Sequence, residues 1–92
     1  MAVARVIETR ITPGEYDQMR KVLGITDTPP PGGAFHVAAV GEDGNLRIVE
    51  VWDSREQAEA WSEKVATARE AAGFGGNPPL IEYLEVHSIV QR

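Results

Sequence analysis

Residues 34–54, AFHVAAVGEDGNLRIVEVWDS, are the stretch of the chain that decides the fold. Two apolar runs, residues 34–41 and 46–53, flank a polar segment that contains Asp43 and Gly44. An Asp-Gly pair between two apolar runs is a strong short-range signal of a β-hairpin. The pattern therefore predicts two antiparallel strands joined by a tight turn.

A strand and a helix are predicted before this hairpin. Residues 2–10 (AVARVIETR) are rich in β-branched side chains and partly alternate, as is typical of a strand. Residues 12–15 (TPGE) place Thr, Pro and Glu where a capping box begins a helix. This helix is expected to run to about Leu23, with Tyr16, Met19 and Leu23 as its apolar stripe.

A second helix and a last strand are predicted after the hairpin. Ser54 is expected to cap a helix that Gly73 ends, and the apolar spacing of this helix assigns Trp61 to the core. Residues 80–90 are predicted to form the last strand. The order strand–helix–strand–strand–helix–strand predicts one ferredoxin-like α+β domain over residues 1–92. Its four-stranded antiparallel sheet has the strand order 4-1-3-2 and carries both helices on one face.

Length and composition restrict the possible functions. A chain of 92 residues without cysteine can use neither disulfides nor a Cys-based zinc site to support a small core. The net charge of −5 argues against nucleic acid and against anionic membranes as partners. The apolar stretch at the N-terminus is interrupted by Arg5 and Glu8 and resembles neither a signal sequence nor a membrane span. A cytoplasmic location is the expectation.

The two hairpin strands predict a homodimer. Residues 34–40 are apolar on both faces except at His36, and residues 46–52 place apolar side chains on both faces. Strands buried on both sides read as continuous apolar runs, and two helices cover only one face of the sheet. The second face is therefore expected to pack against the sheet of a second copy.

These elements resemble the dimeric α+β barrel superfamily over essentially the whole chain. The resemblance rests on residues 51–54 (VWDS), which lead from a strand into an acidic helix, and on residues 13–15 (PGE), which open the first helix. Antibiotic-biosynthesis monooxygenases, muconolactone isomerases and stress-responsive barrel proteins belong to this superfamily. The resemblance implies a pocket between sheet and helices for a hydrophobic small molecule. Some cofactor-free monooxygenases of the superfamily carry an amide four residues before the strand tryptophan, where this chain has Ile48.

The candidate acid–base residues are His36 and Glu50. Glu50 shares a strand face with Trp52, whose indole N–H needs an acceptor when buried. A hairpin loop of two or four residues would place His36 opposite Val51, on the other face. A loop of three or five residues with a bulge at Gly44 would place His36 beside Glu50 or Trp52. The second register is preferred because it gives both polar groups a partner.

Six further residues are predicted to bind the ligand, and three charged residues in the strands are predicted to form ion pairs. The candidates for ligand binding are Tyr16, Phe35, Ile48, Trp52, Tyr83 and His87, although His87 fits the dimer interface equally well. Cross-strand ion pairs are the interpretation for Arg5, Glu82 and Glu85. The sequence predicts no cofactor, and the spacing of histidines and acids predicts no metal site.

Two questions stay open at the level of sequence. Residues 24–33 (GITDTPPPGG) fit a stiff crossover or a lid over the pocket. The function fits a dimeric small-molecule-binding protein, a cofactor-independent monooxygenase, cyclase or isomerase acting on an aromatic or polyketide-like substrate, or a structural or regulatory dimer.

Overall fold

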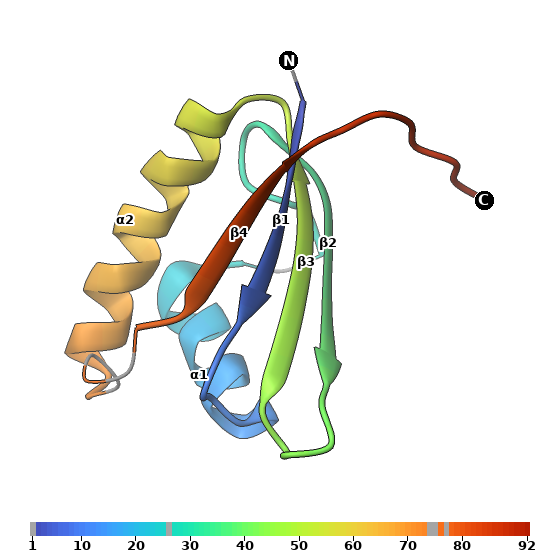
Figure 1. The fold of residues 1–92 in the computed structure, drawn as a ribbon. Coiled ribbons are helices and arrows are strands. Elements are labelled where there is room, and N and C mark those ends of the chain that lie inside the picture. The colour runs from blue at the N-terminus through green and yellow to red at the C-terminus, as the bar shows by residue number, and fades with distance from the viewer. Residues whose placement is uncertain (1, 26, 74–75, 77) are drawn as a thin grey trace.

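The computed structural model describes residues 2–25, 27–73, 76 and 78–92 and has the predicted ferredoxin-like α+β fold. Both helices cover the same face of the sheet (Figure 1). The elements in chain order are β1 (Val3–Glu8), α1 (Pro13–Leu23), β2 (Gly33–Val40), β3 (Leu46–Trp52), α2 (Arg55–Ala71) and β4 (Leu80–Glu85).

The sheet has the order β2-β3-β1-β4, and its neighbouring strands are antiparallel. This order confirms the sequence prediction. The two strands that follow helices, β2 and β4, form the edges, and β1 and β3 lie in the centre.

The helix ends agree with the sequence signals. The Thr12 side chain accepts a hydrogen bond from the Glu15 backbone, and the Glu15 side chain accepts one from the Thr12 backbone, which is a complete capping box. Gly24 ends α1 with a φ of 71°, a left-handed conformation that glycine adopts without a Cβ clash. Ser54 caps α2 by accepting from the backbone of Gln57.

The β2–β3 hairpin has the bulged register. Gly41 donates to the Asn45 carbonyl at 2.8 Å, and Gly44 donates to the Gly41 carbonyl at 3.0 Å with a φ of 81°. A type I turn followed by a left-handed glycine is the usual form of the three-residue hairpin loop. Because of this loop, His36 pairs with Glu50 across the two strands.

The buried core lies between the sheet and the helices. Its buried apolar residues are Ile7, Met19, Leu46, Ile48, Trp52, Ala58 and Ala68. Trp61 was expected among them, but it is only half-buried, because its side chain faces a cavity instead of packed neighbours. The opposite face of the sheet exposes the apolar side chains of Val6, Phe35, Val37, Val49 and Leu84.

The last strand is shorter than the sequence predicted. β4 ends at Glu85 and not at residue 90, because its partner β1 begins at Val3, which pairs with Glu85. After a single hydrogen bond from Val86 to Ala2, the chain leaves the sheet and runs away from the domain (Figure 1). None of the helices in the described parts of the chain is long and apolar enough to cross a membrane.

Candidate functional site

A cavity of about 750 Å³ lies between the sheet and the two helices. Ile7, Ile48 and Trp52 form its floor on the sheet, and Met19 of α1 and Val65 of α2 belong to its helical walls. A volume of a few hundred Å³ with mainly apolar walls and a few polar groups is typical of a small-molecule site.

The polar groups of the cavity are organised around the Glu50 carboxylate. Its Oε1 atom accepts hydrogen bonds from Arg5 Nε at 2.9 Å, Arg5 Nη2 at 2.6 Å and Trp52 Nε1 at 2.9 Å. Its Oε2 atom lies 2.9 Å from His36 Nδ1. The buried Glu50 side chain therefore has a partner for both oxygens, as a buried carboxylate requires.

These contacts fix the protonation state of Glu50. Burial by itself raises the pKa of the carboxyl group. The hydrogen bonds from His36, Trp52 and Arg5 and the charge of Arg5 outweigh burial and lower the pKa from 4.5 to about 2. Glu50 is therefore a carboxylate at neutral pH.

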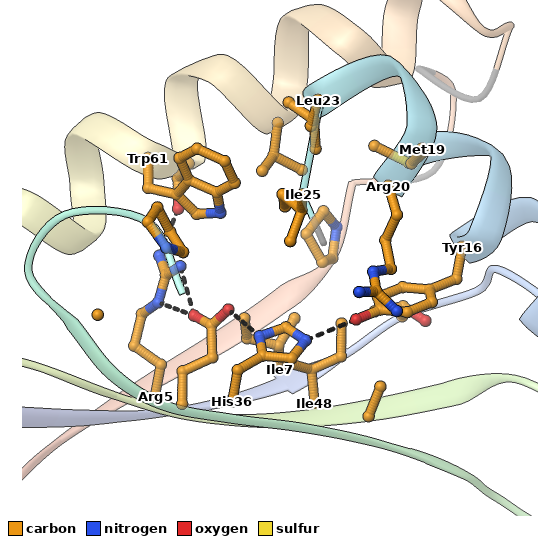
Figure 2. A pocket seen from close by; sticks show the side chains of 18 of the residues that line it. Arg5, Ile7, Tyr16, Met19, Arg20, Leu23, Ile25, His36, Ile48 and Trp61 are labelled. Carbon is orange, nitrogen blue, oxygen red and sulfur yellow. Dashed lines mark hydrogen bonds and ion pairs between the residues drawn. The ribbon is translucent and has the colours of Figure 1, made fainter. Parts of the chain in front are cut away.

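His36 has a defined orientation at the edge of the cavity. An ionised Glu50 can only accept a hydrogen bond, so His36 Nδ1 carries a hydrogen. The other ring nitrogen, Nε2, lies 2.7 Å from the Tyr16 hydroxyl. Figure 2 shows His36 between Tyr16 and the polar group that contains Arg5. Burial raises the pKa of Tyr16, and Glu50 and Asp17 raise it further against the lowering effect of Arg20, so the phenol keeps its proton. When His36 is in its neutral form, it accepts from Tyr16 and donates to Glu50. Its side chain is 34% exposed.

Arg5 holds this arrangement together through a cross-strand ion pair, although its partner is Glu50 and not Glu82 or Glu85, as the sequence had suggested. It is almost fully buried and pairs with Glu50, the residue directly across from it in the β1–β3 register. Its Nη1 atom also donates to the Ala58 carbonyl at 3.1 Å and to the Ser62 hydroxyl. An arginine in the interior of a central strand, with one acidic residue in the paired strand, was the signal available in the sequence.

Most of the predicted ligand-binding residues lie at the cavity. Tyr16, Phe35, Ile48 and Trp52 line it together with the two predicted acid–base residues, His36 and Glu50. Phe35 reaches the cavity only from its rim, because its register partner is on the outer face of the sheet and the residue is 42% exposed.

Two predicted residues lie outside the cavity lining. Tyr83 is on the inner face of β4, but its ring lies under the Arg55 guanidinium, at 4.1 Å, and 3.4 Å separates its hydroxyl from Arg5 Nη1. His87 is exposed beyond the end of β4, because the sheet has already lost its pairing partner there.

The sequence did not identify the residues that α2 and the 24–33 segment contribute. Trp61, Ser62 and Arg69 line the cavity from α2, and the Trp61 ring lies 6.4 Å from that of Trp52. Asp27, Thr28, Pro29 and Pro30 line it from the segment that the sequence left open as a crossover or a lid. The apolar spacing of α2 had assigned Trp61 to one face of the helix, but it did not distinguish a cavity wall from a packed core.

The described residues contain no group of three or more His, Asp or Glu side chains that could hold a metal ion. The Glu50 oxygens already accept from three side chains. The chemistry that this set offers is proton transfer at His36 and hydrogen bonding by Tyr16 and Arg5.

Comparison with known proteins relates the chain to solved structures. No family model and no curated protein matches the sequence. A candidate antibiotic biosynthesis monooxygenase from Chloroflexus aurantiacus is similar at 23% identity and a TM-score of 0.68, covering 99% of this chain and 98% of that one. The NE2512 protein of unknown function from Nitrosomonas europaea is 16% identical with a TM-score of 0.72, covering 99% and 94%. SnoaB, a cofactor-independent oxygenase from Streptomyces nogalater, is 13% identical with a TM-score of 0.57, covering 99% and 96%. The chain therefore has the ferredoxin-like α+β fold of antibiotic-biosynthesis-monooxygenase-like proteins.

Proposed function

We propose that this protein binds a flat aromatic small molecule in the cavity and transfers a proton from it to His36. The observation that carries the proposal is the directed hydrogen-bond chain from Tyr16 through His36 to the ionised Glu50, at the edge of an apolar cavity. A base whose second nitrogen is held by a carboxylate is the arrangement that enzymes use to orient an imidazole.

Proton transfer would begin at His36 Nε2. An acidic hydroxyl or C–H group of a bound ligand replaces the Tyr16 hydroxyl as the partner of this nitrogen and gives its proton to it. The imidazolium that forms is stabilised by Glu50, whose negative charge the Arg5 pair maintains. Tyr16 then lies close enough to donate to the oxygen on which negative charge develops.

Among such reactions, we propose cofactor-independent monooxygenation, and the fold shared with SnoaB supports this choice. An anthrone-type substrate that loses a proton to His36 becomes an electron-rich enolate. Molecular oxygen oxidises this enolate, so that one oxygen atom enters the ring as a quinone carbonyl and the other leaves as water. An isomerase or cyclase would use the same first proton transfer and would not consume oxygen.

The test uses anthrone as the probe, with an oxygen electrode and the absorbance of anthraquinone as readouts. The wild-type protein should consume one O₂ per anthraquinone formed, and His36→Gln should lower the rate by at least about a hundredfold, the usual contribution of a general base. His87→Gln is the matched control, because this histidine lies outside the cavity, and it should keep the wild-type rate. Equal rates for the two variants would contradict the role of His36.

We also propose that two copies form a homodimer through the uncovered face of the sheet. Val6, Phe35, Val37, Val49 and Leu84 expose apolar side chains there, on the face of the sheet opposite to the buried core. Monomeric proteins rarely leave a contiguous apolar surface of this kind open. A second copy would cover it by a twofold arrangement in which each chain keeps its own cavity. The cytoplasmic location stays a prediction.

A further inference from the structure

The cavity continues along α2 beyond the His36 site. Ser62, which contacts Arg5, and Arg69 both line it, with Val65 and Ala66 between them. From residue 62 to residue 69 an α-helix rises by about 10 Å, at ~1.5 Å per residue. Ser62, which contacts the Arg5 that pairs with Glu50, and Arg69 therefore lie at separate places along α2, with apolar side chains between them.

Arg69 differs from Arg5, which lines the cavity from β1, in its partners. Arg5 is satisfied by Glu50, whereas the Nε atom of Arg69 is buried and has no hydrogen-bond partner within the described part of the chain. Burying an N–H donor without an acceptor costs free energy. A ligand that supplies an acceptor would remove this cost. Arg69 lies in the last turn of α2, where a cation interacts favourably with the helix dipole. This interaction does not explain why its Nε atom is buried.

The charge of the cavity also differs from that of the whole protein. Four arginines and two acidic residues line the cavity among the described residues, whereas the whole chain has a net charge of −5. One of the two acidic residues, Glu50, is already paired with Arg5. A cleft with an excess of positive charge and low-dielectric walls attracts anions.

We infer that the ligand of this cavity is a fused-ring aromatic acid whose carboxylate is bound by Arg69, with its acidic hydroxyl or C–H group directed to His36. A guanidinium binds a carboxylate through two parallel N–H donors, which would give the buried Nε its acceptor. The ring system would lie between the two ends, against Val65 and Trp61 of α2. This inference rests on the proposed function and specifies its substrate class.

The experiment compares anthraquinone-2-carboxylate with anthraquinone-2-carboxamide, which have the same ring system and differ in charge. Calorimetric titration should give at least about tenfold tighter binding of the carboxylate by the wild-type protein, as expected for a charge-assisted pair. Arg69→Gln should remove this preference and leave the affinity for the carboxamide within about twofold. Arg69→Lys keeps the charge and should retain part of the preference.

Lys64→Gln is the matched control, because it removes a positive charge from an exposed position of the same helix. It should keep the carboxylate preference, and Arg69→Gln should melt within a few degrees of the wild type. Equal binding of both probes, or a preference that Arg69→Gln retains, would overturn the inference and leave the aromatic pocket intact. Failure of the wild-type protein to bind either probe would overturn the proposed function and this inference with it.

Discussion

His36 Nδ1 lies 2.9 Å from Glu50 Oε2, because the bulged β2–β3 hairpin pairs these two residues directly across the strands. The contact joins a partly exposed imidazole to a buried carboxylate that Arg5 and Trp52 also hold. It connects the edge of the cavity, where a ligand can reach, with a buried carboxylate that is only 4% exposed.

Replacing Glu50 by Gln should destabilise the protein strongly. The substitution leaves Arg5 as a buried charge without a counter-ion, and removing one partner of a buried pair costs about 3–5 kcal/mol. Urea denaturation measures this loss. Glu59→Gln is the control, because Glu59 pairs with Arg55 on the surface, where such a pair contributes about 0–1 kcal/mol. Equal stability of the two variants would contradict a structural role for the buried pair.

The stability should depend on acid pH through Glu50. The pKa of Glu50 is about 2 in the folded protein, and its ordinary value, which applies to the unfolded chain, is 4.5. As the pH falls, the unfolded chain therefore binds the proton first. The stabilisation is complete above pH 4.5 and is lost between pH 4.5 and pH 2, by about 3 kcal/mol in total. Unfolding free energies measured from pH 7 to pH 2 should show this decline. The same titration of Glu50→Gln should lack this component, and an unchanged pH profile in that variant would contradict the assignment.

The two tryptophans should differ in what they contribute. Trp52 is 2% exposed and donates to Glu50, so Trp52→Ala should cost about 3–5 kcal/mol. Trp61 is half-buried at the cavity, so Trp61→Ala should cost less, about 1–3 kcal/mol. Urea denaturation of both variants gives the comparison, and a larger loss for Trp61→Ala would place it in the packed core after all.

Binding of an aromatic probe should be reported by tryptophan fluorescence. Anthraquinone-2-carboxamide is expected to quench Trp61, because this ring lies on the cavity wall contributed by α2. In Trp61→Phe the quenching should fall while calorimetry still detects binding, and the quenching that remains reports on Trp52, which forms part of the cavity floor. A variant that is quenched as much as the wild type would show that the probe does not reach Trp61.

The protein should sediment as a dimer of about twice the 10.0 kDa of one chain at micromolar concentration. Val49→Asp places a charge in the middle of the uncovered sheet face, where Val49 is 37% exposed, and should produce a monomer. Val22→Asp on the surface of α1 is the matched control, since Val22 is 63% exposed on the helical side. A wild-type monomer, or a dimer that Val49→Asp leaves intact, would contradict this interface.

Local signals in the sequence determined the fold. The capping residues Thr12 and Ser54 and the left-handed glycines Gly24 and Gly44 each act within a few residues, so their effect can be recognised from the chain alone. Apolar runs rich in β-branched residues and bounded by turn residues indicated which elements are strands, and chain connectivity then gave the strand order.

Only the tertiary structure decided which polar residues meet. A shift of one residue in the hairpin would have moved His36 to the opposite face, and the sequence allowed both registers. Arg5, Ser62 and Arg69 come from β1 and α2, and their positions at the cavity depend on how these elements pack, which no local pattern records. The extent of β4 was decided in the same way, since a strand continues only as far as its partner provides hydrogen bonds, and β1 provides none for His87.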